Sequence, residues 1–131
     1  MRALELYDYA VIRVVPRVER EEFVNAGVIL SCQASGFLAA AIALDEARLQ
    51  ALDHLLQRHL AAIVAICEGA PGSGPIGQLP LRARFHWLTA RRSSIIQTSP
   101  VHTGLCTDPG AALEHVMDRM VRPLPTPRRP A

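Results

Sequence analysis

The chain has 131 residues, of which 50% are hydrophobic and 20% are charged, and its net charge at pH 7 is +2. This length and composition predict one globular domain with its own core and exclude a disordered protein. The longest apolar run covers only residues 37–44, whereas a membrane-spanning helix needs about 20 residues, so we expect no membrane partner.

The N-terminus and the cysteines indicate where the protein works. Residues 1–5 lack the basic and apolar regions of a secretory signal. Cys32, Cys67 and Cys106 are odd in number and far apart, and they form no C-x-x-C pair. We therefore expect free thiols and a reduced, cytoplasmic setting.

Charge is distributed unevenly along the chain. Every basic residue is Arg; residues 69–107 contain four Arg and no acid, whereas residues 1–68 contain six Arg and nine acids. The middle segment is thus a local anion-attracting block, although genome composition explains the exclusive use of Arg equally well. The chain lacks a uniform basic surface for nucleic acid, so that partner stays open without being favoured.

The first third of the chain predicts three strands. The β-branched run Tyr9–Val15 ends at Pro16 and is apolar on both faces except at Arg13, which indicates a central strand. A second strand is expected over Val24–Cys32, and the turn at 33–36 leads into a third over Phe37–Ala43. The connection 17–22 is too short for a crossover helix, so we expect antiparallel pairing throughout.

The rest of the chain predicts three helices and one more strand. A helix capped by Asp45 should present the apolar stripe Leu49, Leu52, Leu56, Ile63 and Ile66, and the Gly- and Pro-rich segment 69–80 predicts a loop after it. A short helix over 81–88, a strand over 94–98 and a last helix capped by Asp108 follow.

Together these elements predict an α+β domain over residues 1–122. We expect a three- to four-stranded, mostly antiparallel sheet with about three helices packed on one side. The tail 123–131 has four Pro and should be extended or disordered.

The familiar catalytic and cofactor motifs are absent from the sequence. There is no G-x-x-x-x-G-K-[ST], G-x-G-x-x-G, H-E-x-x-H or G-x-S-x-G. His54 and His59 are five residues apart, so they do not share a helix face as metal ligands would. The sequence therefore predicts no cofactor and no metal and favours a non-catalytic role.

Two polar features nevertheless deserve a functional hypothesis. Arg13 lies in an apolar strand and needs a partner: Glu22 or Asp8 in a structural ion pair, or the anion of a ligand. A second group surrounds the short strand at 94–98, where Arg and hydroxyl side chains could bind phosphate and His102 could exchange a proton. The same groups could equally cap a helix and form a turn. The candidate binding residues are Arg13, Glu22, Asn25, Arg91, Arg92, Ser93, Gln97, His102 and Thr103.

Two blocks of sequence, in a defined order, resemble a known family. The first block reads Tyr-Asp-Tyr-Ala-Val-Ile-Arg-Val-Val-Pro over residues 7–16 and Glu-Phe-Val-Asn-Ala-Gly-Val-Ile-Leu over 22–30. The second reads Phe-His-Trp-Leu-Thr-Ala over 85–90, Arg-Ser-Ser-Ile-Ile-Gln over 92–97 and Ser-Pro-Val-His-Thr-Gly over 99–104. Both are similar to the DUF3037 family of bacterial proteins, although Glu21 stands where that family often has Gly.

The resemblance covers about residues 7–121 but implies little about activity, because the family has no established function. Its members resemble products of genes often found beside a HipA-like kinase, which implies a protein partner of that kind. It implies no catalytic residues.

Two classes of function therefore stay open. The first is a non-catalytic accessory module that acts through a protein partner, with an anionic ligand as an addition. The second is a small enzyme or nucleic-acid-binding protein acting on a phosphate-bearing substrate. The enzyme would use Arg13, Arg92 and His102 with Glu22, which requires these side chains to converge in one pocket.

Overall fold

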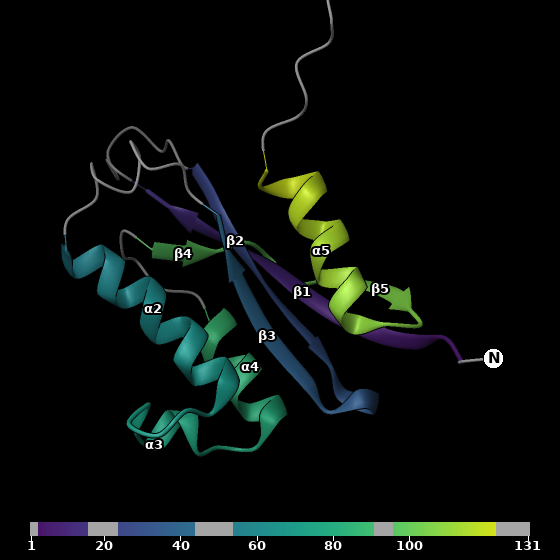
Figure 1. Cartoon of the computed structure of the whole chain (residues 1–131), viewed down its shortest axis with the longest axis horizontal. Coiled ribbons are helices and arrows are strands. Elements are labelled where there is room, and N and C mark those ends of the chain that lie inside the picture. The colour runs from purple at the N-terminus through teal and green to yellow at the C-terminus, as the bar shows by residue number, and fades with distance from the viewer. Residues whose placement is uncertain (1–2, 16–23, 44–53, 91–95, 123–131) are drawn as a thin grey trace, which may run out of the picture.

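The computed structural model describes residues 3–15, 24–43, 54–90 and 96–122 (Figure 1). The α+β class is confirmed. In the described part of the chain, the sheet has five antiparallel strands, one more than the upper limit expected from sequence. The strands are β1 (Glu5–Val14), β2 (Val24–Cys32), β3 (Phe37–Ile42), β4 (Ile96–Thr98) and β5 (His102–Cys106).

Strand β1 is the centre of the sheet, as its two apolar faces predict. It pairs along one edge with β2, and β3 pairs with the far side of β2. Along its other edge, β4 pairs with the C-terminal end of β1 and β5 with the N-terminal end. Ser99 closes the gap between them, because its N–H donates to the Val11 carbonyl and its Oγ accepts from the Val11 N–H, both at 2.8 Å.

The β2–β3 hairpin follows the predicted turn. Residues 33–35 form a single 3-10 turn, and Gly36 adopts a left-handed φ of 63° while its N–H bonds to the Gln33 carbonyl. Within the hairpin, Gly27 lies so close to β3 that a Cβ there would be 2.3 Å from the Ala41 carbonyl oxygen. Because the backbones of β2 and β3 approach so closely here, this position requires Gly.

The helices cover both faces of the sheet, so the expected one-sided arrangement is wrong (Figure 1). Helices α2 (His54–Glu68), α3 (Gly74–Gly77) and α4 (Leu81–Thr89) lie on one side, and α5 (Pro109–Met120) lies on the other. The reason is visible in β2: Ile29 belongs to the core under α2 and α4, whereas Val28 and Leu30 belong to the core under α5. A strand that is apolar on both faces must be covered on both.

Local predictions for the helices hold where the structure describes them. Asp108 caps α5 by accepting hydrogen bonds from the N–H groups of Gly110 and Ala111. Ile63 and Ile66 of the predicted stripe pack into the core, whereas Asp45, Leu49 and Leu52 lie outside the described residues. Segment 69–80 contains the one-turn helix α3 rather than loop alone. No helix in the described part is long and apolar enough to cross a membrane.

Candidate functional site

Three of the predicted residues form a row across the sheet, at the C-terminal end of β1. Arg13 of β1 is paired directly with Asn25 of β2 and with Gln97 of β4. Residues directly opposite each other in antiparallel strands point to the same face. The side chains of the row therefore share the α5 face, and a register shift between Ile12 and Arg13 brings Asn25 into line.

The row lies at the C-terminal end of α5. The Asn25 Nδ2 group donates to the Met120 carbonyl at 2.8 Å, which satisfies a carbonyl that the helix leaves without an internal partner. The Oδ1 atom of Asn25 is buried and accepts no hydrogen bond from the described residues. Arg13 is half-buried, with its Nε atom buried.

Of the two expected partners of Arg13, Asp8 points away from it. Asp8 and Arg13 are five residues apart on one strand, so their side chains emerge on opposite faces. Asp8 instead forms an ion pair with Arg82. Glu22 lies outside the described residues.

His102 and Thr103 lie together on β5 but do not join the row. His102 is paired with Tyr9 and Thr103 with Asp8. His102 thus shares the α5 face with Arg13, but Tyr9 and Arg13 are four residues apart, and four residues of a strand span about 13 Å. The His102 ring lies 5.3 Å from the Tyr9 ring, as part of an aromatic row with Tyr7.

Arg91, Arg92 and Ser93 lie outside the described residues. Ala90 and Ile96, on either side of segment 91–95, both line a cavity of about 340 Å³ between α2, α4 and β4. Its walls are largely apolar and include Trp87 and Ile63. Gln97 of the Arg13 row also lines this cavity, whereas Arg13 and Asn25 do not.

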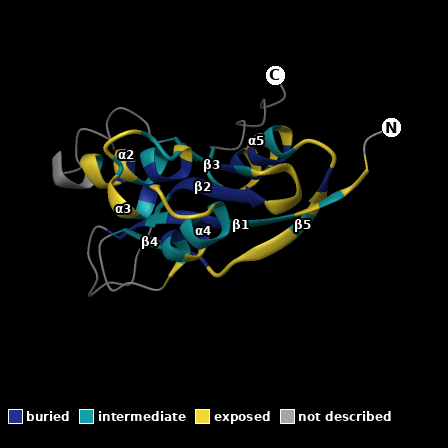
Figure 2. Cartoon of the chain, turned by 90° about the horizontal axis from the view of Figure 1, so that it is seen from below, coloured by how far each residue is buried: buried dark blue, intermediate teal, exposed yellow. Residues whose placement is uncertain are grey.

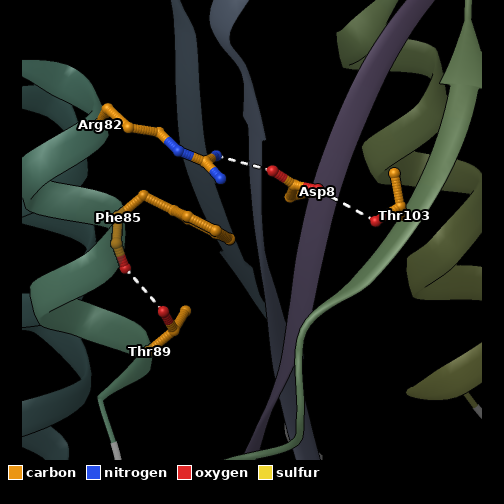
Figure 3. A network of polar contacts seen from close by, with 5 residues as sticks. All are labelled: Asp8, Arg82, Phe85, Thr89 and Thr103. Carbon is orange, nitrogen blue, oxygen red and sulfur yellow. Dashed lines mark hydrogen bonds and ion pairs between the residues drawn. The ribbon is translucent and has the colours of Figure 1, made fainter.

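The other two Arg residues of the acid-free segment have structural partners. The Arg82 guanidinium donates to Asp8 Oδ2 at 2.6 Å and lies 5.3 Å from the centre of the Phe85 ring. Thr103 Oγ1 donates to the other Asp8 oxygen at 3.1 Å, so Asp8 links α4, β1 and β5 (Figure 3). Arg84 donates to the Ile66 and Cys67 carbonyls at the end of α2.

A surface that sequence reasoning missed lies at the N-terminal end of β1, beyond Asp8. Leu6 and Leu105 are paired across β1 and β5, and both are 60% exposed. Leu4, which precedes β1, is 65% exposed and lines a shallow hollow together with Leu105 and residues of α5. We call Leu4, Leu6 and Leu105 the leucine patch. Figure 2 shows β5 as an exposed strand at the margin of the molecule. The alternation Leu-Glu-Leu-Tyr-Asp-Tyr at residues 4–9 was the available signal that the strand begins before Tyr9.

Burial perturbs the acid–base chemistry beneath α5. Burial, with the neighbouring Tyr9 and Cys106, raises the pKa of Tyr7, while Arg119 opposes this effect. Burial and the adjacent Cys32 thiol raise the pKa of Cys106. Among the described residues, all three cysteines are buried and free, and no group of three or more His, Cys, Asp or Glu could hold a metal ion. These thiols therefore suit packing better than nucleophilic chemistry.

Comparison with known proteins gave a single finding. The model of the family described as "Protein of unknown function (DUF3037)" matches residues 9–121. No curated protein and no solved structure matched the chain. The resemblance of the two sequence blocks to this family is therefore confirmed.

Proposed function

The chain belongs to the DUF3037 family, and we propose that it is a cytoplasmic accessory module that acts by binding a protein partner at the leucine patch. The observation that supports this proposal is the exposure of Leu4, Leu6 and Leu105 together at one end of the sheet. Contiguous exposed apolar side chains with a polar border are typical of protein-binding surfaces. The Asp8–Arg82 pair and Thr103 supply that border.

A HipA-like kinase is the first partner to test, because relatives of this chain are expected to be encoded beside such kinases. Capture of a co-expressed kinase, followed by titration calorimetry, would measure the interaction. We expect Leu6→Lys to weaken binding at least tenfold, because a Lys in the buried part of an interface must be desolvated.

The matched control is Leu79→Lys, which places the same charge on another exposed leucine outside the sheet. It should bind like the wild type. Failure to retain any partner, or equal binding by Leu6→Lys, would contradict the proposal.

The Arg13 row supports an additional anion-binding role. Three polar side chains from three strands share one face there, and Arg binds carboxylate and phosphate groups through two parallel hydrogen bonds. We expect inorganic phosphate to raise the melting temperature of the wild type and to have less effect on Arg13→Gln, with Arg58→Gln as a surface control. An equal rise in melting temperature for the wild type and both variants would contradict this role.

The enzymatic and nucleic-acid alternatives have their own tests. An enzyme that uses Arg13 with His102 would have to span the roughly 13 Å between their positions on the sheet. Nucleic-acid binding would weaken steeply with salt and would be lost when Arg91 and Arg92 become Ala.

A further inference from the structure

No described strand pairs with the outer edge of β5. Within the described part of the chain, β5 pairs with β1 alone, over five consecutive residues without a register shift. His102, Thr103 and Leu105 are exposed. The backbone N–H and C=O groups on the outer side of such a strand are available to another strand.

This edge lacks the features by which proteins usually prevent strand addition. It contains no charged residue, no Pro and no bulge, all of which commonly protect edge strands. The opposite edge of the sheet differs, because β3 is buried or half-buried along its length and α2 packs against it. Of these two edge strands, β5 is the more exposed.

We propose that β5 pairs antiparallel with β5 of a second copy of this chain, around a twofold axis through Gly104. This register pairs all five residues: Gly104 lies opposite Gly104, Thr103 opposite Leu105, and His102 opposite Cys106. No two charged residues meet, and the axis passes through the one position without a side chain. The edge is thus complementary to itself, which an isologous dimer requires.

The pairing has a consequence for the leucine patch. A twofold axis perpendicular to the sheet keeps the same face of both copies on the same side. Leu105 then lies diagonal to Leu105 of the second copy, and diagonal neighbours are about 7–8 Å apart. The two patches merge into one apolar strip across a ten-stranded sheet. The use of this strip as a docking surface rests on the proposed function, whereas the pairing of the two β5 strands does not.

Sedimentation equilibrium of the full chain at concentrations up to about 1 mM tests the pairing. Because the paired edge is short, we expect a weak dimer of 14.3 kDa copies, with dissociation in the micromolar range. Leu105→Lys should be monomeric, because it places one positive charge from each copy beside the twofold axis. Leu79→Lys, the control, should dimerise like the wild type.

Cysteine crosslinking tests the register and does not depend on the Lys variant folding. A mixture of Thr103→Cys and Leu105→Cys chains, oxidised with glutathione disulfide, should form crosslinked heterodimers faster than either variant alone, because residues 103 and 105 face each other. A monomeric wild type, a fully dimeric Leu105→Lys, or equal crosslinking in all three samples would overturn the proposal.

The variant Leu6→Lys separates this inference from the proposed function. It alters the patch on β1 but not the β5 edge, so it should remain dimeric while losing the protein partner. A monomeric wild type that still binds its partner through Leu6 would overturn the dimer alone. A dimer that captures no partner would overturn the proposed function alone.

Discussion

Gly104 shows how one residue fixes the packing of two strands. It is paired with Tyr7, whose ring lies across it, so that a Cβ at this position would be 2.5 Å from the phenol ring. Gly104 is the centre of β5, yet Gly is a poor strand former. The position is therefore explained by the Tyr7 side chain rather than by backbone preference.

Replacement of Gly104 by Ala should destabilise the fold by about 1–3 kcal/mol, because the ring must move or the strands must separate. Urea unfolding measures the change. In Gly110→Ala the nearest atom would be at 3.4 Å, and Ala favours the helix, so this control should be neutral or stabilising. A double-mutant cycle with Tyr7→Ala should show that the two effects are coupled; additivity would disprove the explanation.

Cys67 predicts a loss of stability at alkaline pH. Burial raises the pKa of its thiol from 9.0 to about 12. The unfolded state therefore releases this proton first, so the contribution is fully present below about pH 9 and is lost as the pH rises toward about 12. The raised pKa values of Tyr7 and Cys106 act in the same direction.

The free energy of unfolding of the wild type should thus fall more steeply between about pH 9 and about pH 12 than that of Cys67→Val. The variant should keep part of the slope, because Tyr7 and Cys106 remain. Equal slopes for the two proteins would show that the Cys67 thiol does not contribute.

At the scale of elements, the sequence correctly predicted the strand bounds and helix caps that depend on residues close together in the chain. The bounds of β2 and the cap of α5 follow from a β-branched run and from Asp108 before Pro109. Strand β5 was missed, because its short sequence with Gly104 becomes a strand only by pairing with β1, far away in the chain. Tertiary context overrides local propensity there.

The candidate site likewise combines a residue that the local sequence identified with contacts that only the fold creates. Arg13 was recognised because a charge in an apolar strand requires an explanation, but its alignment with Asn25 and Gln97 depends on strand order and register. The ion pair between Arg82 and Asp8 joins residues from different elements, and no local sequence pattern indicates it.

The Asp108 cap gives a prediction for α5. Asp108→Ala removes the acceptor for two backbone N–H groups and should destabilise the protein by about 0.5–2 kcal/mol. Thermal unfolding followed by circular dichroism measures this change. The neighbouring exchange Thr107→Ala is the control and should have a smaller effect; equal effects would argue against capping.

At the scale of the molecule, two hydrophobic cores share one sheet. The core under α2 and α4 contains Ile29, and the core under α5 contains Leu30, its immediate neighbour on β2. Loss of either core should therefore disturb the strand that supports the other. We expect both to unfold in one cooperative transition.

The chain contains one Trp and two Tyr, which report on different cores. Trp87 packs against the α2–α4 core, and Tyr7 and Tyr9 pack against the α5 core. Leu30→Ala should cost about 2–5 kcal/mol and should lower the urea midpoints of Trp fluorescence and Tyr absorbance equally. A Trp midpoint that stays at its wild-type value would show that the cores unfold separately.

The leucine patch can form only after β5 has been synthesised. Strands β1, β2 and β3 are consecutive and leave the ribosome first, whereas β4 and β5, which pair with the second edge of β1, follow after helices α2, α3 and α4. Until then that edge of β1 is open and exposed to association with other chains. Leu6 meets Leu105 only after β5 has been made, so a partner that recognises the patch distinguishes chains that have completed this sheet from chains that have not.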